Sequence, residues 1–322
     1  MRPFDLVPAT TVDDALMALG PTWDQRLLAG GTDVLPALKD DVYTTTRLVS
    51  LSRIADLKQF SEDEAGLHIG ALVTLDNLLD APLVRDRYPT LWHAIRLAAS
   101  PQLRNMGTLG GNLGQDSRCW YYRGPFQCWL KGGDTCYARD GENRLHAIFD
   151  QSPCVSTHPT DPGTALLALD ARLRIQSPRG ETTRPLAEHF APPTTERRRL
   201  NTLAPDEVIV GIDVPAPAPG ARGLYLKAMD RAAWSFALVS VAVVLDLDSG
   251  QARDVRLVLG GVANTPWRAQ AAEAALRGRP LDDTTIATAA RAATDGAKPL
   301  AHNGYKVELA QALVRQALTA LR

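Results

Sequence analysis

The sequence predicts a mixed fold, α/β in its N-terminal part and α+β at its C-terminal end. The chain has 322 residues, about twice the size of an ordinary domain. Residues 1–55 alternate strand, helix and strand patterns, which is typical of an α/β unit. Residues 206–322 show several strand patterns followed by three amphipathic helices, the order expected for a separate α+β domain.

A first subdomain is expected over residues 1–55. Thr10 or Thr11 can cap its first helix, and Gly20 and Pro21 can end it. A second strand then runs into a glycine-rich turn that opens another helix. The expected strands are 4–8, 26–28 and 48–51, and the expected helices are 12–19 and 34–39.

A second subdomain is expected over 56–180, interrupted by a cysteine-rich insertion at 115–157. The two subdomains together make a first domain, 1–180. Residues 181–205 are rich in Pro, Thr and Arg and are expected to be a linker, and 165–175 fits a helix or a strand equally well. The remaining expected strands are 57–60, 67–72, 208–214, 223–228, 235–247 and 255–262; the helices are 75–79, 91–99, 266–277, 282–294 and 304–321; and 101–113 is expected to be a glycine-rich loop.

The composition is that of an ordinary globular protein. Apolar residues make up 45% of the chain and charged residues 22%, which excludes a disordered or fibrous chain. Lys and Arg total 35 against 36 Asp and Glu, so no nucleic-acid partner is expected. No run of about 18 apolar residues occurs, so we expect no membrane span. The N-terminus lacks the apolar region of a signal peptide, and a cytoplasmic location is the expectation.

Two short glycine loops are candidates for binding phosphate. Ala29-Gly30-Gly31-Thr32-Asp33 follows a strand and opens a helix, where backbone N–H groups favour an anion. Thr108-Leu109-Gly110-Gly111-Asn112 is the second loop. Either loop alone also fits an ordinary tight turn. Together they fit a long ligand with two phosphates, such as FAD, which needs several contacts with the backbone.

The four cysteines fall within one short segment, which predicts a metal centre. Cys119, Cys128, Cys136 and Cys154 are the only cysteines of the chain. Four thiolates are the ligand set of an iron–sulfur cluster or of structural zinc. Zinc modules usually bring paired ligands of the CxxC kind, which are absent here. Disulfides are the third alternative, and they are disfavoured in a chain without an export signal.

Asp161 and Lys227 each have two interpretations. Asp161, in the segment His-Pro-Thr-Asp, fits a contact to a ribose or ring, or the start of a helix. Lys227 fits a contact to a flavin ring or a solvated strand end. The basic triplet 197–199 is expected to be solvated. No nucleophile motif or paired histidine spacing occurs, so no catalytic residue is expected on this chain.

Six segments stand out along the chain: LLAGGTDVLPAL at 27–38, TLGGNL at 108–113, HPTD at 158–161, PDEVIVGIDVP at 205–215, YLKAMDRAAWSFALVSVA at 225–242 and GGVANTPWRA at 260–269. In order and spacing, they resemble the FAD-binding medium subunit of the molybdenum hydroxylases, the xanthine dehydrogenase and carbon monoxide dehydrogenase superfamily. The resemblance runs nearly from end to end. It implies an FAD-binding domain of the vanillyl-alcohol-oxidase type, built of two α/β subdomains, followed by an α+β domain.

The resemblance also implies a set of FAD contacts and a set of partners. The partners are a large subunit with a molybdenum cofactor and a small subunit with two [2Fe–2S] clusters, and electrons would pass to an external acceptor or come from a donor. The implied FAD contacts are Leu28, Ala29, Gly30, Gly31, Thr32, Asp33, Val34, Thr108, Gly110, Gly111, Asn112, Asp161, Ile209 and Lys227.

The insertion at 115–157 departs from most of the superfamily. A minority of subunits, similar to periplasmic-type aldehyde oxidoreductases and to 4-hydroxybenzoyl-CoA reductase, carry a [4Fe–4S] cluster there, and the spacing here looks more like the aldehyde-oxidoreductase form. Periplasmic relatives are exported with a partner that carries the signal, which is the alternative to a cytoplasmic location. The competing hypotheses are a stand-alone flavin enzyme on the same fold and a zinc-stabilised binding module.

Overall fold

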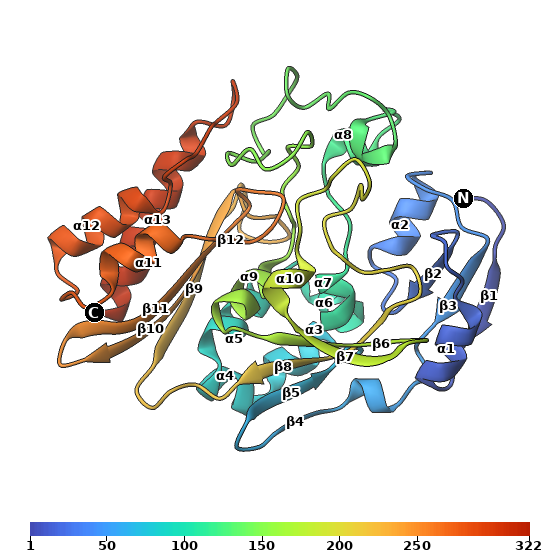
Figure 1. Cartoon of the computed structure of the whole chain (residues 1–322), viewed down its shortest axis with the longest axis horizontal. Helices are drawn as coiled ribbons and strands as arrows, with labels where there is room; N and C mark the ends of the chain where they lie inside the picture. The colour runs from blue at the N-terminus through green and yellow to red at the C-terminus, as the bar shows by residue number, and fades with distance from the viewer.

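The computed structural model describes residues 1–322 and confirms the mixed fold (Figure 1). Its first layer is a small parallel sheet with the strand order β1-β3-β2. Thr11 caps the first helix: its hydroxyl accepts the Asp14 amide, and the Asp14 carboxylate accepts the Thr11 amide. The elements are β1 (Asp5–Pro8), α1 (Val12–Ala18), β2 (Gln25–Leu28), α2 (Val34–Lys39) and β3 (Arg47–Ser50).

The second layer is an antiparallel sheet of five strands in the order β4-β5-β8-β6-β7. Helices pack on it through a buried core of 31 residues that joins Leu67 of the sheet to Leu91 and Leu166 of two helices. The elements are η1 (Asp56–Lys58), β4 (Phe60–Glu62), β5 (Gly66–Gly70), α3 (Leu75–Asp80), α4 (Pro82–Arg87), α5 (Pro89–Arg96), α6 (Pro101–Met106), α7 (Leu109–Leu113), α9 (Asp161–Ala168), β6 (Arg172–Ser177), β7 (Gly180–Pro185), α10 (Leu186–His189) and β8 (Val208–Pro215).

The structure differs from the sequence expectation at 101–113, which is not a loop. Ser100 and Thr108 accept amide hydrogen bonds at the starts of α6 and α7, and these two caps stabilise short helices in a segment whose glycines favour a turn. The segment 165–175, for which a helix and a strand were equally possible, contains the end of a helix followed by the start of a strand. Helix α9 ends at Ala168, the chain turns at Asp170 with φ 52°, and β6 follows.

The expected linker and the boundary after it also differ from the structure. Strand β7 and helix α10 lie within 181–205, because Gly180 closes a hairpin between β6 and β7. Strand β8 lies between β5 and β6, so the sheet of the first domain extends past 206 to Pro215. The strand pairing therefore joins Val208–Pro215 to the N-terminal domain.

The C-terminal part is a sheet of four strands in the order β12-β11-β10-β9, covered on one face by three helices (Figure 1). Alternate residues of β10 point to opposite sides: Val241 and Val243 join the core under these helices, whereas Ala242 and Val244 join the core of the first domain. The three C-terminal helices and the first domain therefore pack against opposite faces of this sheet. Its elements are β9 (Arg222–Ala228), β10 (Val239–Asp248), β11 (Gln251–Gly260), β12 (Trp267–Arg268), α11 (Gln270–Leu276), α12 (Asp283–Ala292) and α13 (Tyr305–Leu321).

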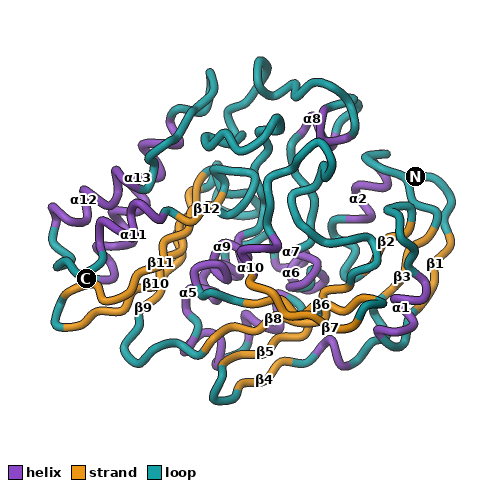
Figure 2. Tube along the Cα trace, in the orientation of Figure 1, coloured by secondary structure: helices purple, strands orange, loops and turns teal.

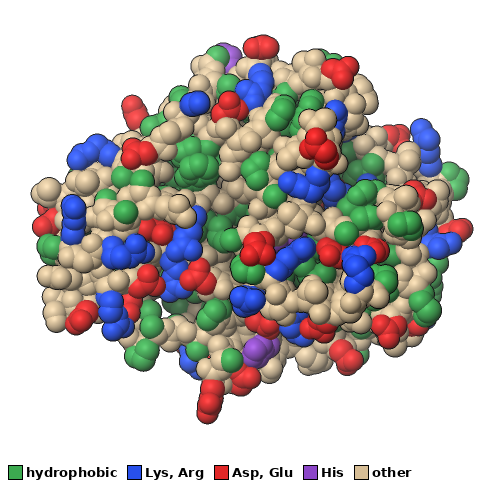
Figure 3. Space-filling view, viewed as in Figure 1, with side chains coloured by type: hydrophobic (Ala, Val, Ile, Leu, Met, Phe, Trp, Pro, Cys, Tyr) green, Lys and Arg blue, Asp and Glu red, His purple; other side chains and the backbone are tan.

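The cysteine-rich insertion contains little regular structure, as the long loop beside α8 in Figure 2 shows. Its only helical turns are α8 (Trp120–Arg123) and η2 (Trp129–Lys131). None of the helices is long and apolar enough to cross a membrane. Basic and acidic side chains are interspersed on the face drawn in Figure 3, in line with the net charge of −1.

Candidate functional site

A cavity of about 800 Å³ lies between the first sheet layer, the second layer and the loop after β9. This volume is at the upper end of the range of about 300–1,000 Å³ for ligand pockets. Both glycine loops line it. The residues of the implied FAD contact set on its wall are Ala29, Gly30, Gly31, Thr32, Asp33, Val34, Thr108, Gly110, Gly111, Asn112, Asp161 and Ile209.

The two glycine loops pack directly against neighbouring backbone. A Cβ on Gly30 would overlap the carbonyl oxygen of Met106, and a Cβ on Gly110 would come within 2.9 Å of the Ala71 carbonyl oxygen. Gly31 has φ +74°, which favours glycine. The amides of Leu109 and Gly110 donate to carbonyls of the 71–73 segment, so the second loop is fixed to the sheet edge. Both glycine loops are therefore held close to neighbouring backbone.

Asp33 links the first glycine loop to the insertion. Its carboxylate accepts hydrogen bonds from Arg123 at 2.6 Å and from the Asp116 amide at 2.8 Å, and it forms an ion pair with Arg118 at 3.0 Å. Both guanidiniums lie mostly out of solvent, so these bonds to a charged acceptor are stronger than neutral ones. The carboxylate is thus occupied by the protein itself, and its role at the cavity is to hold the loop and the insertion together.

Asp161 is fixed by two side chains of strand β9. The Lys227 ammonium donates to Asp161 Oδ2 at 2.8 Å and to the Leu97 carbonyl at 2.9 Å, and the Tyr225 hydroxyl donates to Asp161 Oδ1 at 2.6 Å. The side chain of Lys227 has no exposed surface and does not line the cavity; Leu28 does not line it either. Lys227 therefore stands behind Asp161. Burial raises the pKa of Tyr225 well above its usual value, so it stays a hydrogen-bond donor.

Sequence reasoning missed Tyr225 as part of the site. It lies two residues before Lys227 on the same strand, so both side chains point to the same face. That period of two was the available signal once Lys227 had been singled out.

Sequence reasoning also missed three arginines on the cavity wall. Arg26 stacks on Tyr43 and Arg199 stacks on Trp23, each with its guanidinium carbon 3.5 Å from the ring centroid. The Nε atoms of Arg26, Arg118 and Arg199 are buried without a hydrogen-bond partner. Orphaned cationic donors beside backbone loops fit an anionic ligand with phosphate groups, as FAD is.

The expectation that the basic triplet 197–199 is solvated is wrong. Arg197 donates to three carbonyls of its own loop, and Arg198 donates to the carbonyls of Trp129 and Gly133 in the insertion. Arg199 reaches the cavity. A charged run in a polar loop usually faces water. Here each arginine instead contacts the protein: the first two bond to backbone carbonyls, and the third stacks on an aromatic ring.

All four cysteines line one small apolar cavity in the insertion, with a volume of about 10 Å³. All four are free thiols, and no group of three or more His, Cys, Asp or Glu side chains is arranged to hold a metal ion. Burial raises the pKa of Cys119 to about 11, whereas a hydrogen bond from Cys154 lowers the pKa of Cys136 to about 6. Four convergent thiols are the donor set of an iron–sulfur cluster or of structural zinc.

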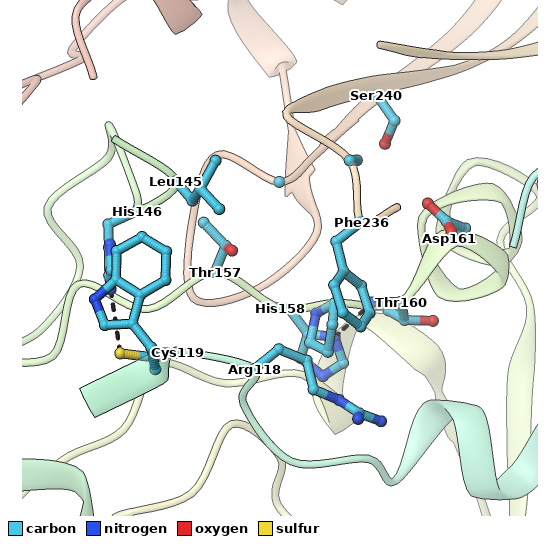
Figure 4. A pocket seen from close by; sticks show the side chains of 14 residues that line it. Arg118, Cys119, Leu145, His146, Thr157, His158, Thr160, Asp161, Phe236 and Ser240 are labelled. Atoms are coloured by element: carbon cyan, nitrogen blue, oxygen red, sulfur yellow. Dashed lines mark hydrogen bonds between the residues drawn. The ribbon is translucent and has the colours of Figure 1, made fainter. Parts of the chain in front are cut away.

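A third pocket, with a volume of about 60 Å³, adjoins both of these cavities, and Figure 4 shows the side chains that line it. It shares Cys119 with the cysteine cavity, and it shares Arg118, Pro159, Asp161 and Phe236 with the large cavity. The three hollows therefore adjoin one another in series.

Two buried histidines face this middle pocket. Burial lowers the pKa of His158 to about 3; burial and the nearby Lys306 lower that of His146 to about 4. Both rings are neutral near pH 7. His146 Nε2 lies 3.1 Å from Cys119 Sγ.

The comparisons with known proteins agree with this geometry. Residues 2–217 match the family described as the FAD binding domain in molybdopterin dehydrogenase, and 224–321 match the CO dehydrogenase flavoprotein C-terminal domain. The chain is 35% identical over 328 residues to the aldehyde oxidoreductase FAD-binding subunit PaoB of Escherichia coli strain K12, covering 100% of this chain and 99% of that protein.

Two further similarities involve carbon monoxide dehydrogenase of Hydrogenophaga pseudoflava. Its medium chain is 28% identical over 323 residues, covering 98% of this chain and 96% of that protein. A solved structure of the enzyme matches with a TM-score of 0.80 and 29% identity over 100% of this chain and 98% of that one. This chain therefore belongs to the FAD-binding medium subunits of the xanthine dehydrogenase and CO dehydrogenase family, as an oxidoreductase subunit of the molybdenum hydroxylase type.

Proposed function

We propose that this chain is an electron-transfer subunit that uses FAD together with a [4Fe–4S] cluster. Its partners are a large subunit with a molybdenum cofactor and a small subunit with two [2Fe–2S] clusters, and it exchanges electrons with an external acceptor or donor. The observation that carries the proposal is the series of three adjoining hollows, from the glycine-lined cavity through the pocket of Figure 4 to the four thiols.

The residues of the large cavity have distinct roles toward FAD. The backbone amides of the first glycine loop, 29–33, would bind the pyrophosphate, with the orphaned guanidiniums of Arg26 and Arg199 nearby. The amides of the second loop are already bonded within the chain, so its glycines would serve close approach of the ligand. Asp161, held in place by Tyr225 and Lys227, offers an acceptor whose position does not depend on the ligand. When bound, FAD supplies exchange of electrons in steps of one or two, and the cluster in steps of one.

The four cysteines are the ligands we propose for the cluster. Their thiols already converge on one cavity, and the aromatic rings of Tyr121, Tyr122 and Trp129 form an apolar shell around it. Such a shell limits the access of water and tunes the reduction potential. Zinc is the competing occupant, and it predicts a colourless insertion.

The reaction type we propose is that of an aldehyde oxidoreductase, with the 4-hydroxybenzoyl-CoA reductase type as the next candidate. The support is the 35% identity to a protein named as the FAD-binding subunit of an aldehyde oxidoreductase. The organic substrate would react on the partner that carries molybdenum. We propose a cytoplasmic location, with co-export to the periplasm beside a signal-bearing partner as the alternative.

The first test is a visible spectrum with iron, zinc and flavin analysis of the full chain purified anaerobically. We expect flavin peaks on a broad iron–sulfur shoulder, with about four iron atoms per FAD. A Cys128→Ser variant should lose iron and keep FAD, because Cys128 lies outside the flavin cavity. Ser156→Ala, which changes the cavity wall without removing a thiol, serves as the matched control and should keep both.

The other outcomes separate the parts of the proposal. Stoichiometric zinc without iron would retain the flavin subunit and exclude the cluster. Normal turnover of the assembled complex with its physiological acceptor after Cys128→Ser would exclude the cluster as a relay.

A further inference from the structure

Cys119 is the one cysteine that faces the flavin side of the insertion. It lines both the cysteine cavity and the middle pocket, whereas the other three line the cysteine cavity alone. The middle pocket in turn shares Asp161 and Phe236 with the large cavity. A group that contacts the sulfur of Cys119 therefore lies between the two proposed redox centres.

His146 is that group. Figure 4 shows its ring beside Cys119, with Nε2 3.1 Å from Sγ. The histidine is 3% exposed, and Trp120 packs edge-on against its ring at 5.1 Å between centroids. Its backbone is fixed at both ends: the amide donates to the Asn143 carbonyl, and the carbonyl accepts from Asn303. The ring is thus held against the sulfur by the protein and has little freedom to turn away.

The direction of this hydrogen bond depends on what the sulfur binds. A free thiol can donate its S–H to Nε2. A sulfur that ligates iron has no proton, so the bond then requires the tautomer with hydrogen on Nε2. The other ring nitrogen, Nδ1, is buried without a partner, which is tolerable for a lone pair but costly for an N–H. The surroundings of the ring therefore favour hydrogen on Nε2, aimed at Cys119.

We propose that His146 is a positioning residue for electron transfer, whose Nε2–H donates to Cys119 Sγ and raises the reduction potential of the cluster on its flavin-facing side. This inference rests on the proposed [4Fe–4S] cluster. Hydrogen bonds to cluster sulfurs stabilise the more negative, reduced state. No other cysteine sulfur has a hydrogen bond from a side-chain nitrogen; the side-chain partner of Cys154 outside the cysteines is the hydroxyl of Ser156.

A potentiometric titration of His146→Ala tests this inference. We follow the cluster by EPR and the flavin by its visible bands. Loss of the bond should lower the cluster potential so that the electron-sharing equilibrium with FAD changes about tenfold, which is about 59 mV for a one-electron couple. The flavin potential should not change. His158→Ala is the matched control, since His158 is equally buried on the same pocket but contacts no cysteine, and its cluster potential should stay at the wild-type value.

A second measurement needs no variant. Pulsed EPR of the reduced unmodified protein, with ¹⁵N-labelled histidine, should show a weak coupling of one imidazole nitrogen to the cluster. No such coupling, or an unchanged potential in His146→Ala with four irons retained, would overturn the role of His146 and leave the cluster in place. An unmodified protein without iron would instead refute the proposed function on which this inference rests.

Discussion

The flavin cavity and the cysteine insertion lie side by side but are built in opposite ways. The glycine loops of the cavity wall lie at the ends of regular elements, and the amides of Leu109 and Gly110 bond to carbonyls of the 71–73 segment. The insertion has two short helical turns. Its two small buried clusters hold 7 residues, of which Ala37 and Val42 lie outside the insertion, and 3 residues, against 31 in the largest core. The cavity therefore has a frame of its own, whereas the insertion has almost none.

Side chains from the rest of the chain help to hold the insertion by bonding to its backbone carbonyls, beside backbone bonds such as those from Ile148 and Phe149 to the Val262 carbonyl. Asn264 donates to the carbonyls of Cys154 and Ser156, and Asn303 to those of His146 and Ala147. The buried Lys306 donates to the carbonyl of Leu145, next to His146. Damage to the cavity frame should therefore spread through the fold, whereas damage to one of these bonds should stay local.

The largest expected effect is on the frame of the cavity. Lys227→Met removes the ammonium that faces Asp161 and leaves a buried carboxylate with only the Tyr225 hydroxyl. Breaking a buried ion pair on one side costs about 3–5 kcal/mol of unfolding free energy. Urea unfolding should show this loss across the whole chain, and FAD should dissociate more readily.

An exposed ion pair provides the control for this loss. The guanidinium of Arg179, 62% exposed, pairs with Asp206 at 2.7 Å. Arg179→Met should cost less than about 1 kcal/mol, because solvent screens the pair. If both variants lost the same small amount, Asp161 would not depend on Lys227, and the cavity frame would be as loosely held as the insertion.

The sequence predicts the elements around the cavity better than it predicts the contacts that hold the insertion. The β-α-β opening, the strands β8 and β9 and the helices of the C-terminal part have clear apolar periods, and the structure confirms them. The two glycine loops could be found because close approach of backbone requires glycine. The domain boundary was misplaced because β8 is apolar on both sides, and nothing local in such a strand says which sheet it joins.

The polar ties of the insertion could not be predicted. Arg198, Asn264 and Asn303 lie 65 or more residues from the carbonyls that they bind, and each looks like an ordinary surface residue in the sequence. Sequence periodicity reports local geometry and carries no signal for such long-range contacts. The cysteines were recognisable only because all four fall in one segment.

Acid should weaken both regions, and each buried histidine should contribute less than the loss of Lys227. The pKa of His146 is about 4, of His158 about 3 and of His189 about 4, all lowered chiefly by burial. Unfolded histidines have pKa values near 6.5, so below that pH the unfolded chain binds protons that the folded chain does not. The free energy of unfolding is therefore highest above about pH 6.5. It decreases as the pH is lowered below that value, by up to about 2 kcal/mol per ring at pH 5.

Urea unfolding at pH 7.5 and pH 5 measures this loss. His189→Gln keeps a donor for the Leu113 carbonyl that His189 Nε2 bonds at 3.2 Å but removes one titrating ring. It should reduce the loss between the two pH values by about one third. A stability that does not change between pH 7.5 and pH 5 would mean that the three rings are hydrated and that burial does not set their pKa values.

The smallest expected effect is on a single tie of the insertion. Arg198 Nη1 donates to the carbonyls of Trp129 and Gly133 at 2.6 and 2.7 Å, and its guanidinium lies 4.8 Å from the Trp129 ring centroid. Arg198→Ala removes these bonds beside Cys128, at a local cost of about 1–2 kcal/mol. Amide hydrogen exchange over 127–135 should then accelerate by about 5–30-fold, with little change in global unfolding.

Arg197→Ala is the matched control, since Arg197 bonds only its own loop, and it should leave the exchange rates of 127–135 unchanged. Equal acceleration in both variants would show that the insertion depends on the whole 190–200 loop, and the contrast between a framed cavity and a separately tied insertion would then be lost.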